Sequence, residues 1–140
     1  MPRSPRTRSR RARRARAARI EALAAGREVA VPCRARRTTP RGWGAWVDGT
    51  LRLPGDHDGG EAAFLVDDPS DVALVTRQGE APVALEPPLE VEVRPVRYKA
   101  ESFYGGDAGI LVVTTARRTL EVALHGDEVE PVARRLADRG

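Results

Sequence analysis

The stretch ILVVTTARRTLEVALHGDEVEPVARRLADR, residues 110–139, decides the fold, because its apolar residues change from the period of a strand to that of a helix. Residues 110–115 are apolar and β-branched, which predicts a buried strand. Ala116-Arg117-Arg118 then predicts a turn. In 119–124 apolar and polar side chains alternate, as expected of a strand with one buried face. The stretch therefore begins with a predicted antiparallel hairpin.

A helix is predicted over residues 127–139. Asp127 is suited to cap its N-terminus, with Glu130 three residues later completing a capping box. Pro131 is tolerated in a first turn, where its missing N–H has no helical partner to lose. The apolar side chains recur at intervals of three and four residues, so they share one face that packs on the sheet. These side chains are Val129, Val132, Ala133 and Leu136.

Upstream of the hairpin, more short segments show the strand pattern, separated by turns rich in Gly and Pro. These segments are 29–34, 43–53, 62–66, 72–76 and 89–98. Gly49 indicates a bend or bulge in the second of them. Six or seven antiparallel strands and one terminal helix predict a mainly β domain over residues 27–140, a small barrel that the helix closes at one end.

Segment 89–98 shows the alternation of a half-buried strand. Its apolar residues, among them Val93, predict the buried side, and its charged residues, among them Arg94, predict the exposed side. Pro95 interrupts the pattern, which favours a sheet edge or a bulge.

Charge divides the chain into two parts. Positions 1–41 hold 14 basic residues against Glu21 and Glu28, a net +12, whereas the other 10 basic and 18 acidic residues give positions 42–140 a net −8. Residues 1–26 therefore form a predicted Arg-rich arm. Its first nine residues are expected to be disordered. A cationic helix is expected from Arg10 to Ala25, ending at Gly26.

The arm has three interpretations. Its arginines can bind nucleic-acid phosphates without sequence specificity, or they can attach to an anionic membrane surface. Alternatively, the 23 arginines against a single lysine reflect a GC-rich coding sequence or a start codon placed too far upstream, and the arm has no partner. The candidate phosphate-contacting residues are Arg10, Arg11, Arg13, Arg14, Arg16 and Arg19.

The residues argue against a membrane-spanning protein, a metal-binding protein and an enzyme. No apolar run approaches the length of roughly 18 residues that a membrane span needs, so we expect a cytoplasmic protein, peripheral at the inner membrane face if the arm binds lipid. Asp56-His57-Asp58 has no second spaced ligand set, so we assign no metal or cofactor. Cys33 has no histidine close in sequence, and a buried strand cysteine is expected. We therefore assign no catalytic residue and expect a protein that is not an enzyme.

Several short strings are similar to a family of small actinobacterial proteins of undetermined activity that contain a pleckstrin-homology-like domain. They are Arg34-Ala35-Arg36 after Cys33, Gly42-Trp43 with Gly49 following, Ala62 to Val66, and Arg118 to Leu124. Members usually carry an N-terminal transmembrane helix, whereas the N-terminus here is hydrophilic. The resemblance implies a pleckstrin-homology-like barrel in a domain that either faces the inner membrane or is cytosolic.

The resemblance also implies one binding site. In lipid-binding members of the fold, a basic loop between the first two strands holds phosphorylated head groups. The corresponding residues here are Arg34, Arg36, Arg37 and Arg41. Trp43 and Trp46 lie close to them in sequence and are expected to fill the core, or else to place one ring at a membrane interface or on a base.

These observations lead to one main hypothesis and two alternatives. We expect a non-enzymatic binding module that docks at the anionic inner membrane, or on a protein there, through the arm and the basic loop. The first alternative is a nucleic-acid-associated protein whose arm contacts phosphates. The second is a protein–protein adaptor that uses a barrel edge or the helix groove.

Overall fold

A computed structural model describes residues 5–39, 42–67, 83–97, 101, 103–104 and 107–138, with the side chains of 5–8, 38, 39 and 43 excepted. The helices are α1 (Pro5–Ala24) and α2 (Gly126–Ala137). The strands are β1 (Val29–Thr39), β2 (Gly42–Trp43), β3 (Val47–Leu53), β4 (Ala62–Val66), β5 (Val83–Leu85), β6 (Glu90–Arg94), β7 (Ala108–Thr114) and β8 (Thr119–His125). The predicted strand 72–76 lies outside the described residues.

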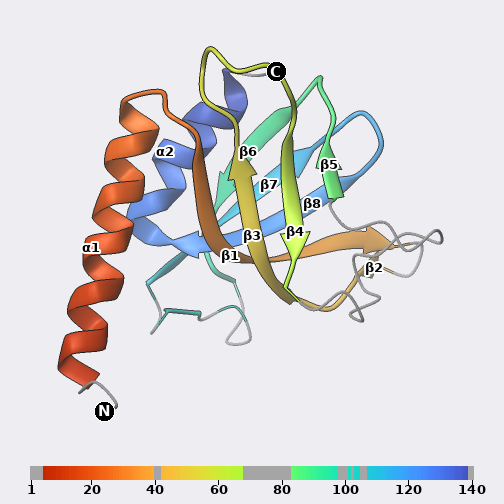
Figure 1. The fold of residues 1–140 in the computed structure, drawn as a ribbon. Helices are drawn as coiled ribbons and strands as arrows, with labels where there is room; N and C mark the ends of the chain where they lie inside the picture. The colour runs from red at the N-terminus through yellow and green to blue at the C-terminus, as the bar shows by residue number, and fades with distance from the viewer. Residues whose placement is uncertain are drawn as a thin grey trace.

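The strands form one curled antiparallel sheet in the order β5-β4-β3-β1-β8-β7-β6, and the short β2 pairs only with the end of β1 (Figure 1). The prediction of a mainly β protein with a C-terminal helix is confirmed. Among the described residues β5 and β6 do not pair with each other, so the sheet is a half-barrel. The expected closed barrel is thus replaced by a half-barrel with two edges.

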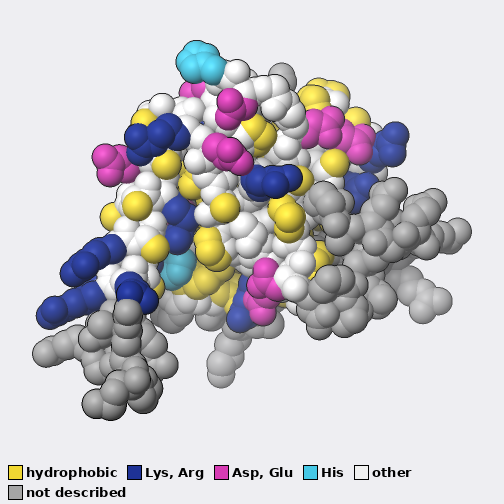
Figure 2. Space-filling model, in the orientation of Figure 1, with side chains coloured by type: hydrophobic (Ala, Val, Ile, Leu, Met, Phe, Trp, Pro, Cys, Tyr) yellow, Lys and Arg dark blue, Asp and Glu magenta, His cyan; other side chains and the backbone are white. Residues whose placement is uncertain are grey.

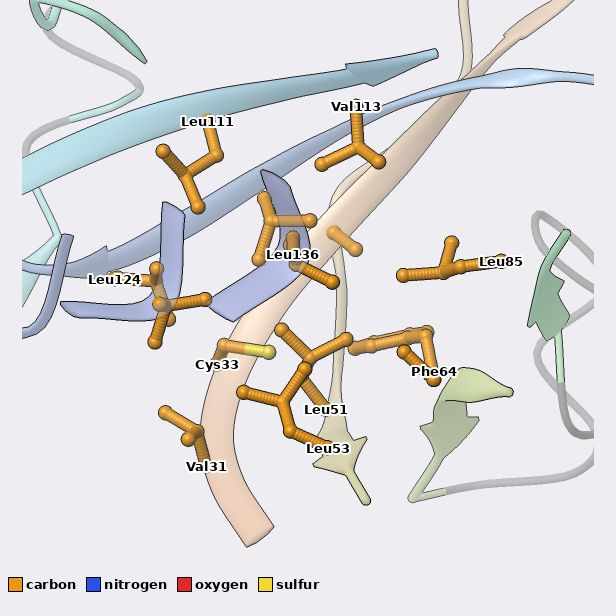
Figure 3. Close-up of a cluster of buried hydrophobic side chains, with 14 of the residues drawn as sticks. Val31, Cys33, Leu51, Leu53, Phe64, Leu85, Leu111, Val113, Leu124 and Leu136 are labelled. Atoms are coloured by element: carbon orange, nitrogen blue, oxygen red, sulfur yellow. The ribbon is translucent and has the colours of Figure 1, made fainter. Parts of the chain in front are cut away.

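The core lies between the concave face of the sheet and α2 (Figure 3). Alternate side chains of the central strands point into it, including Val31 of β1, Leu51 of β3 and Val122 of β8, each with no exposed surface. Leu136 of α2 enters the same cluster. The predicted β7–β8 hairpin is confirmed, and its turn closes where the Thr115 N–H donates to the Arg118 carbonyl.

Gly49 lies within the regular part of β3, paired with Cys33, where the sequence had favoured a bend or bulge. A side chain there would collide with the ring of Phe64 and the carbonyl of Leu65. The glycine therefore permits β3 and β4 to pack closely.

The start of strand β6 follows the predicted alternation, with Val91 packed against the core and Glu90 and Glu92 exposed, but its last two residues reverse it. Val93 is 54% exposed, whereas Arg94 is only 6% exposed. Val93 lies on the outermost strand of the sheet, and Arg94 lies under Glu101, which covers the convex face. Ion pairs with Glu101 and with Glu121 of β8 thus make burial of the arginine possible.

Helix α2 begins at Gly126, one residue before the prediction, and ends at Ala137. His125 occupies the N-cap and no side-chain cap bond forms, so the predicted capping box of Asp127 and Glu130 is wrong. Pro131 lies beyond the first turn. The carboxylates at the start of α2 instead pair with arginines of α1.

Helix α1 is longer than predicted, because residues 5–9 are helical as well. It packs beside α2 and β1 and contributes Leu23 to the core (Figure 1). Its C-terminal end is held by Arg135, which is buried and donates to the carbonyls of Ala22, Leu23 and Arg27. A guanidinium that binds the last carbonyls of a helix also complements its dipole.

Candidate anion-binding surface

Two of the six candidate arginines of the arm hold α1 to the body. Arg19 donates from Nε and Nη2 to both oxygens of Glu128, each at 2.9 Å, and Glu128 is fully buried. This bidentate bond raises the pKa of Arg19. Arg16 donates from Nε to Asp127 at 3.0 Å. Both side chains therefore form internal pairs, Arg19 through two donors and Arg16 through Nε.

The other four candidates, Arg10, Arg11, Arg13 and Arg14, are exposed. At 3.6 residues per turn, Arg10, Arg11 and Arg14 share the side of α1 that faces away from Leu23 and the body. We call these three residues the cationic face. Figure 2 shows dark blue side chains projecting at the lower left, where Figure 1 places the N-terminal half of α1.

The cationic face is free of large apolar side chains. Between residues 9 and 24, the neighbours of its arginines on the same side of the helix are Ala17, Ala18 and Glu21. The larger apolar side chain Leu23 is buried against the body. Contact with a partner through this face is therefore electrostatic.

A cleft of about 490 Å³ lies between α1 and the end of the sheet, and we call it the α1 cleft. Helix α1 contributes Ala12, Arg13 and Arg16, and the facing wall includes Tyr104 and His125. The Tyr104 and His125 rings are stacked, with centroids 3.9 Å apart. Burial raises the pKa of Tyr104 to about 12. Burial and the charge of Arg16 lower the pKa of His125.

The predicted basic loop is in fact the second half of strand β1, which continues to Thr39. Arg34 pairs with Asp48 at 2.7 Å and its guanidinium lies 4.6 Å from the centre of the Phe103 ring. Arg36 donates from Nε to Glu121 at 2.7 Å. Arg41 lies outside the described residues. Phosphate binding by these arginines stays a prediction, and at Arg34 and Arg36 it would compete with internal ion pairs.

Arg37 differs from its neighbours because alternation along β1 points it to the concave side, opposite Leu120. Its Nε is buried and has no hydrogen-bond partner among the described residues. The three described arginines of the group that the resemblance predicts, Arg34, Arg36 and Arg37, therefore do not share one face of β1.

A buried network of four charges lies on the convex face, formed by Arg36, Arg94, Glu101 and Glu121. Arg94 binds Glu101 through two N–H groups, at 3.0 and 2.6 Å, and Glu121 at 2.6 Å. Glu121 also accepts from Arg36. Arg94 holds the pKa of Glu101 down to about 2. The two positive and two negative charges balance, so the network offers no surplus charge to an anion.

Sequence reasoning missed this network, because its members come from separate segments that each resemble an exposed polar position. Above it lies Trp46, whose ring is 4.6 Å from the Arg36 guanidinium and contacts Phe103 edge to face at 5.3 Å. Trp46 therefore covers the convex face and lies outside the main core. The side chain of Trp43 lies outside the described residues.

The other motifs of the sequence have structural roles. Asp56 pairs with Arg135, and Asp58 accepts from the Gly55 N–H. Cys33 is buried in β1 as predicted, and burial raises the pKa of its thiol, which disfavours the reactive thiolate. In the described part of the chain, no three His, Cys, Asp or Glu side chains gather as a metal site would require.

Among the described residues, neither helix combines the length and the apolar character needed to cross a membrane. Comparison of the chain with protein-family models, with curated proteins and with solved structures finds no match.

Proposed function

We propose that the protein is a non-enzymatic binding module, with a pleckstrin-homology-like fold, that docks at the anionic inner surface of the cell membrane. The observation that carries the proposal is the fixed position of the cationic face. Arg16 and Arg19 hold α1 to α2, and Arg135 holds its C-terminal end, so that Arg10, Arg11 and Arg14 project from the acidic body.

The magnitude of the electrostatic attraction suits reversible docking. A basic residue near an anionic bilayer contributes about 1 kcal/mol, so the cationic face supplies about 3 kcal/mol, and Arg13 adds to it. Because this face lacks an apolar side chain that could insert between lipids, the contact is peripheral and weakens with salt. The resemblance of the sequence to an inner-membrane family supports a lipid surface as the partner.

One observation favours a second candidate function, which is binding to duplex nucleic acid. The side of α1 that carries the cationic face consists of arginine, alanine and one glutamate between residues 9 and 24. Purely electrostatic contact is sufficient for non-specific binding to a phosphate backbone. A lipid surface and a duplex therefore have to be separated by competition.

The test is co-sedimentation of the full chain with vesicles of phosphatidylglycerol and phosphatidylcholine, and with phosphatidylcholine alone as the control. The proposal predicts binding to the anionic vesicles only and a loss of binding as salt rises. It also predicts that the protein stays on the vesicles when duplex DNA is added with more phosphate groups than the vesicles have anionic head groups. If DNA removes the protein from the vesicles, nucleic acid replaces the membrane as the partner. If the protein binds neither, a protein partner replaces both.

A further inference from the structure

The α1 cleft has the dimensions of a site for a small organic molecule. Its volume of about 490 Å³ lies within the range of about 300 to 1,000 Å³ that is typical of ligand pockets. One wall is α1, where Ala12 and Ala15 leave room by their small size. The other wall includes Pro32 of β1, Tyr104 and His125.

Three arginines of α1 line the α1 cleft, and of these Arg19 is held by Glu128. The guanidinium of Arg13 forms no hydrogen bond or ion pair with the side chain of a described residue. Arg16 uses Nε for Asp127, and its Nη1 lies 3.4 Å from Nδ1 of His125. Because a guanidinium has about five N–H groups, Arg16 retains donors for a ligand. Asp107 also lines the cleft, and its carboxylate lies beside Gly126 at the start of α2, where the helix dipole stabilises it.

The facing wall carries two stacked rings, those of Tyr104 and His125. Tyr104 has a φ of 57°, a left-handed conformation that is costly for an aromatic residue. The stack on His125 and a hydrogen bond from its hydroxyl to the Ala123 carbonyl, at 3.4 Å, hold it there. Backbone strain of this kind is concentrated at ligand-binding positions. The Tyr104 ring therefore gives the apolar part of a ligand a fixed surface.

We propose that the α1 cleft binds an organic phosphate monoester, whose phosphate pairs with Arg13 and Arg16 and whose apolar part lies against Ala12, Pro32 and Tyr104. A monoester phosphate offers three strong acceptor oxygens, which suit the guanidinium of Arg13 and the N–H groups of Arg16 that Asp127 does not use. The ester comes either from a lipid head group or from a soluble metabolite. This site does not depend on docking through the cationic face.

The test is a titration of the full chain, followed by isothermal calorimetry and by ¹H–¹⁵N spectra. The probes are phenyl phosphate as the soluble ester and dihexanoyl phosphatidic acid as the lipid, with phenol and inorganic phosphate as controls. Arg13→Ala is compared with Arg52→Ala, which removes the same charge from an exposed position of β3, outside both the α1 cleft and the cationic face. Both positions are exposed, so neither change threatens the fold.

We expect one or both esters to bind more tightly than phenol or inorganic phosphate, with the largest spectral shifts at Tyr104 and His125. Arg13→Ala is expected to weaken this binding at least tenfold, and Arg52→Ala less than twofold. The ester that binds more tightly identifies the source. The proposal is overturned if neither ester binds, if inorganic phosphate binds equally well, or if both variants weaken binding equally. Vesicle docking through the cationic face can succeed or fail separately from each of these results.

Discussion

At the scale of the residue, β4 approaches Gly49 so closely that a larger side chain at this position should destabilise the protein. Gly49→Ala places a Cβ against the ring of Phe64 and the backbone of β4. Overpacking of a tight core costs about 1–3 kcal/mol, and we expect urea denaturation to show a loss in that range. Gly59→Ala is the matched control, because nothing lies within 4 Å of a Cβ there. Equal stability of the two variants would contradict the close packing of β3 and β4.

Glu101 makes stability dependent on pH. Its pKa falls from 4.5 to about 2 in the folded protein, chiefly because of its bond to Arg94. A carboxyl with a lowered folded pKa stabilises the protein above its unfolded pKa, and that contribution is lost as the pH falls toward the folded pKa. We therefore expect the free energy of unfolding to decrease between pH 4.5 and pH 2.

The variant Glu101→Gln tests whether this carboxyl group causes the dependence of stability on pH. Breaking a buried ion pair costs about 3–5 kcal/mol, so we expect a large loss of stability at pH 7 and a flatter pH dependence between pH 4.5 and pH 2. Glu92→Gln, at an exposed position of β6, is the control and should leave the stability at pH 7 and its pH dependence unchanged. A wild-type pH profile in Glu101→Gln would show that the acid dependence arises elsewhere.

At the scale of the element, the attachment of α1 depends on the first turn of α2. Glu128→Gln weakens the bidentate bond to Arg19 and leaves that guanidinium without a charged partner in the pair. We expect trypsin to cleave within α1 several-fold faster in this variant, because local opening exposes its arginines. Glu130→Gln, which changes an exposed acid of the same helix, should be cleaved at the wild-type rate. Equal rates would mean that α1 is held mainly by Leu23 and Arg135.

The elements differ in how far the sequence could predict them. The β7–β8 hairpin and α2 follow from periodicity within about 30 residues, and their positions are correct to within two residues. The continuation of β1 through Arg36 and Arg37 could not be predicted, because the charge of Arg36 is balanced by Glu101 and Glu121 from distant segments. The same long-range pairing explains why Arg94 is buried and why Arg16 and Arg19 are structural.

At the scale of the whole molecule, charge is separated between a cationic helix and an acidic body. The internal ion pairs consume part of the positive charge that the sequence places in the arm, and they fix the direction in which the remainder points. The α1 cleft and the cationic face are on different sides of the same helix. The polyanion and the small phosphate ester that we propose as partners would therefore bind at separate places on the molecule.

The most direct test of this account compares two variants with the same loss of charge. One replaces Arg10, Arg11 and Arg14 with alanine, and the other replaces three exposed arginines of the body, Arg52, Arg97 and Arg134. The measurement is the partition of each onto phosphatidylglycerol-containing vesicles at low salt. Three lost contacts of about 1 kcal/mol each predict a roughly 100-fold weaker partition for the first variant. The account predicts little change for the second. Equal losses in the two variants would contradict it.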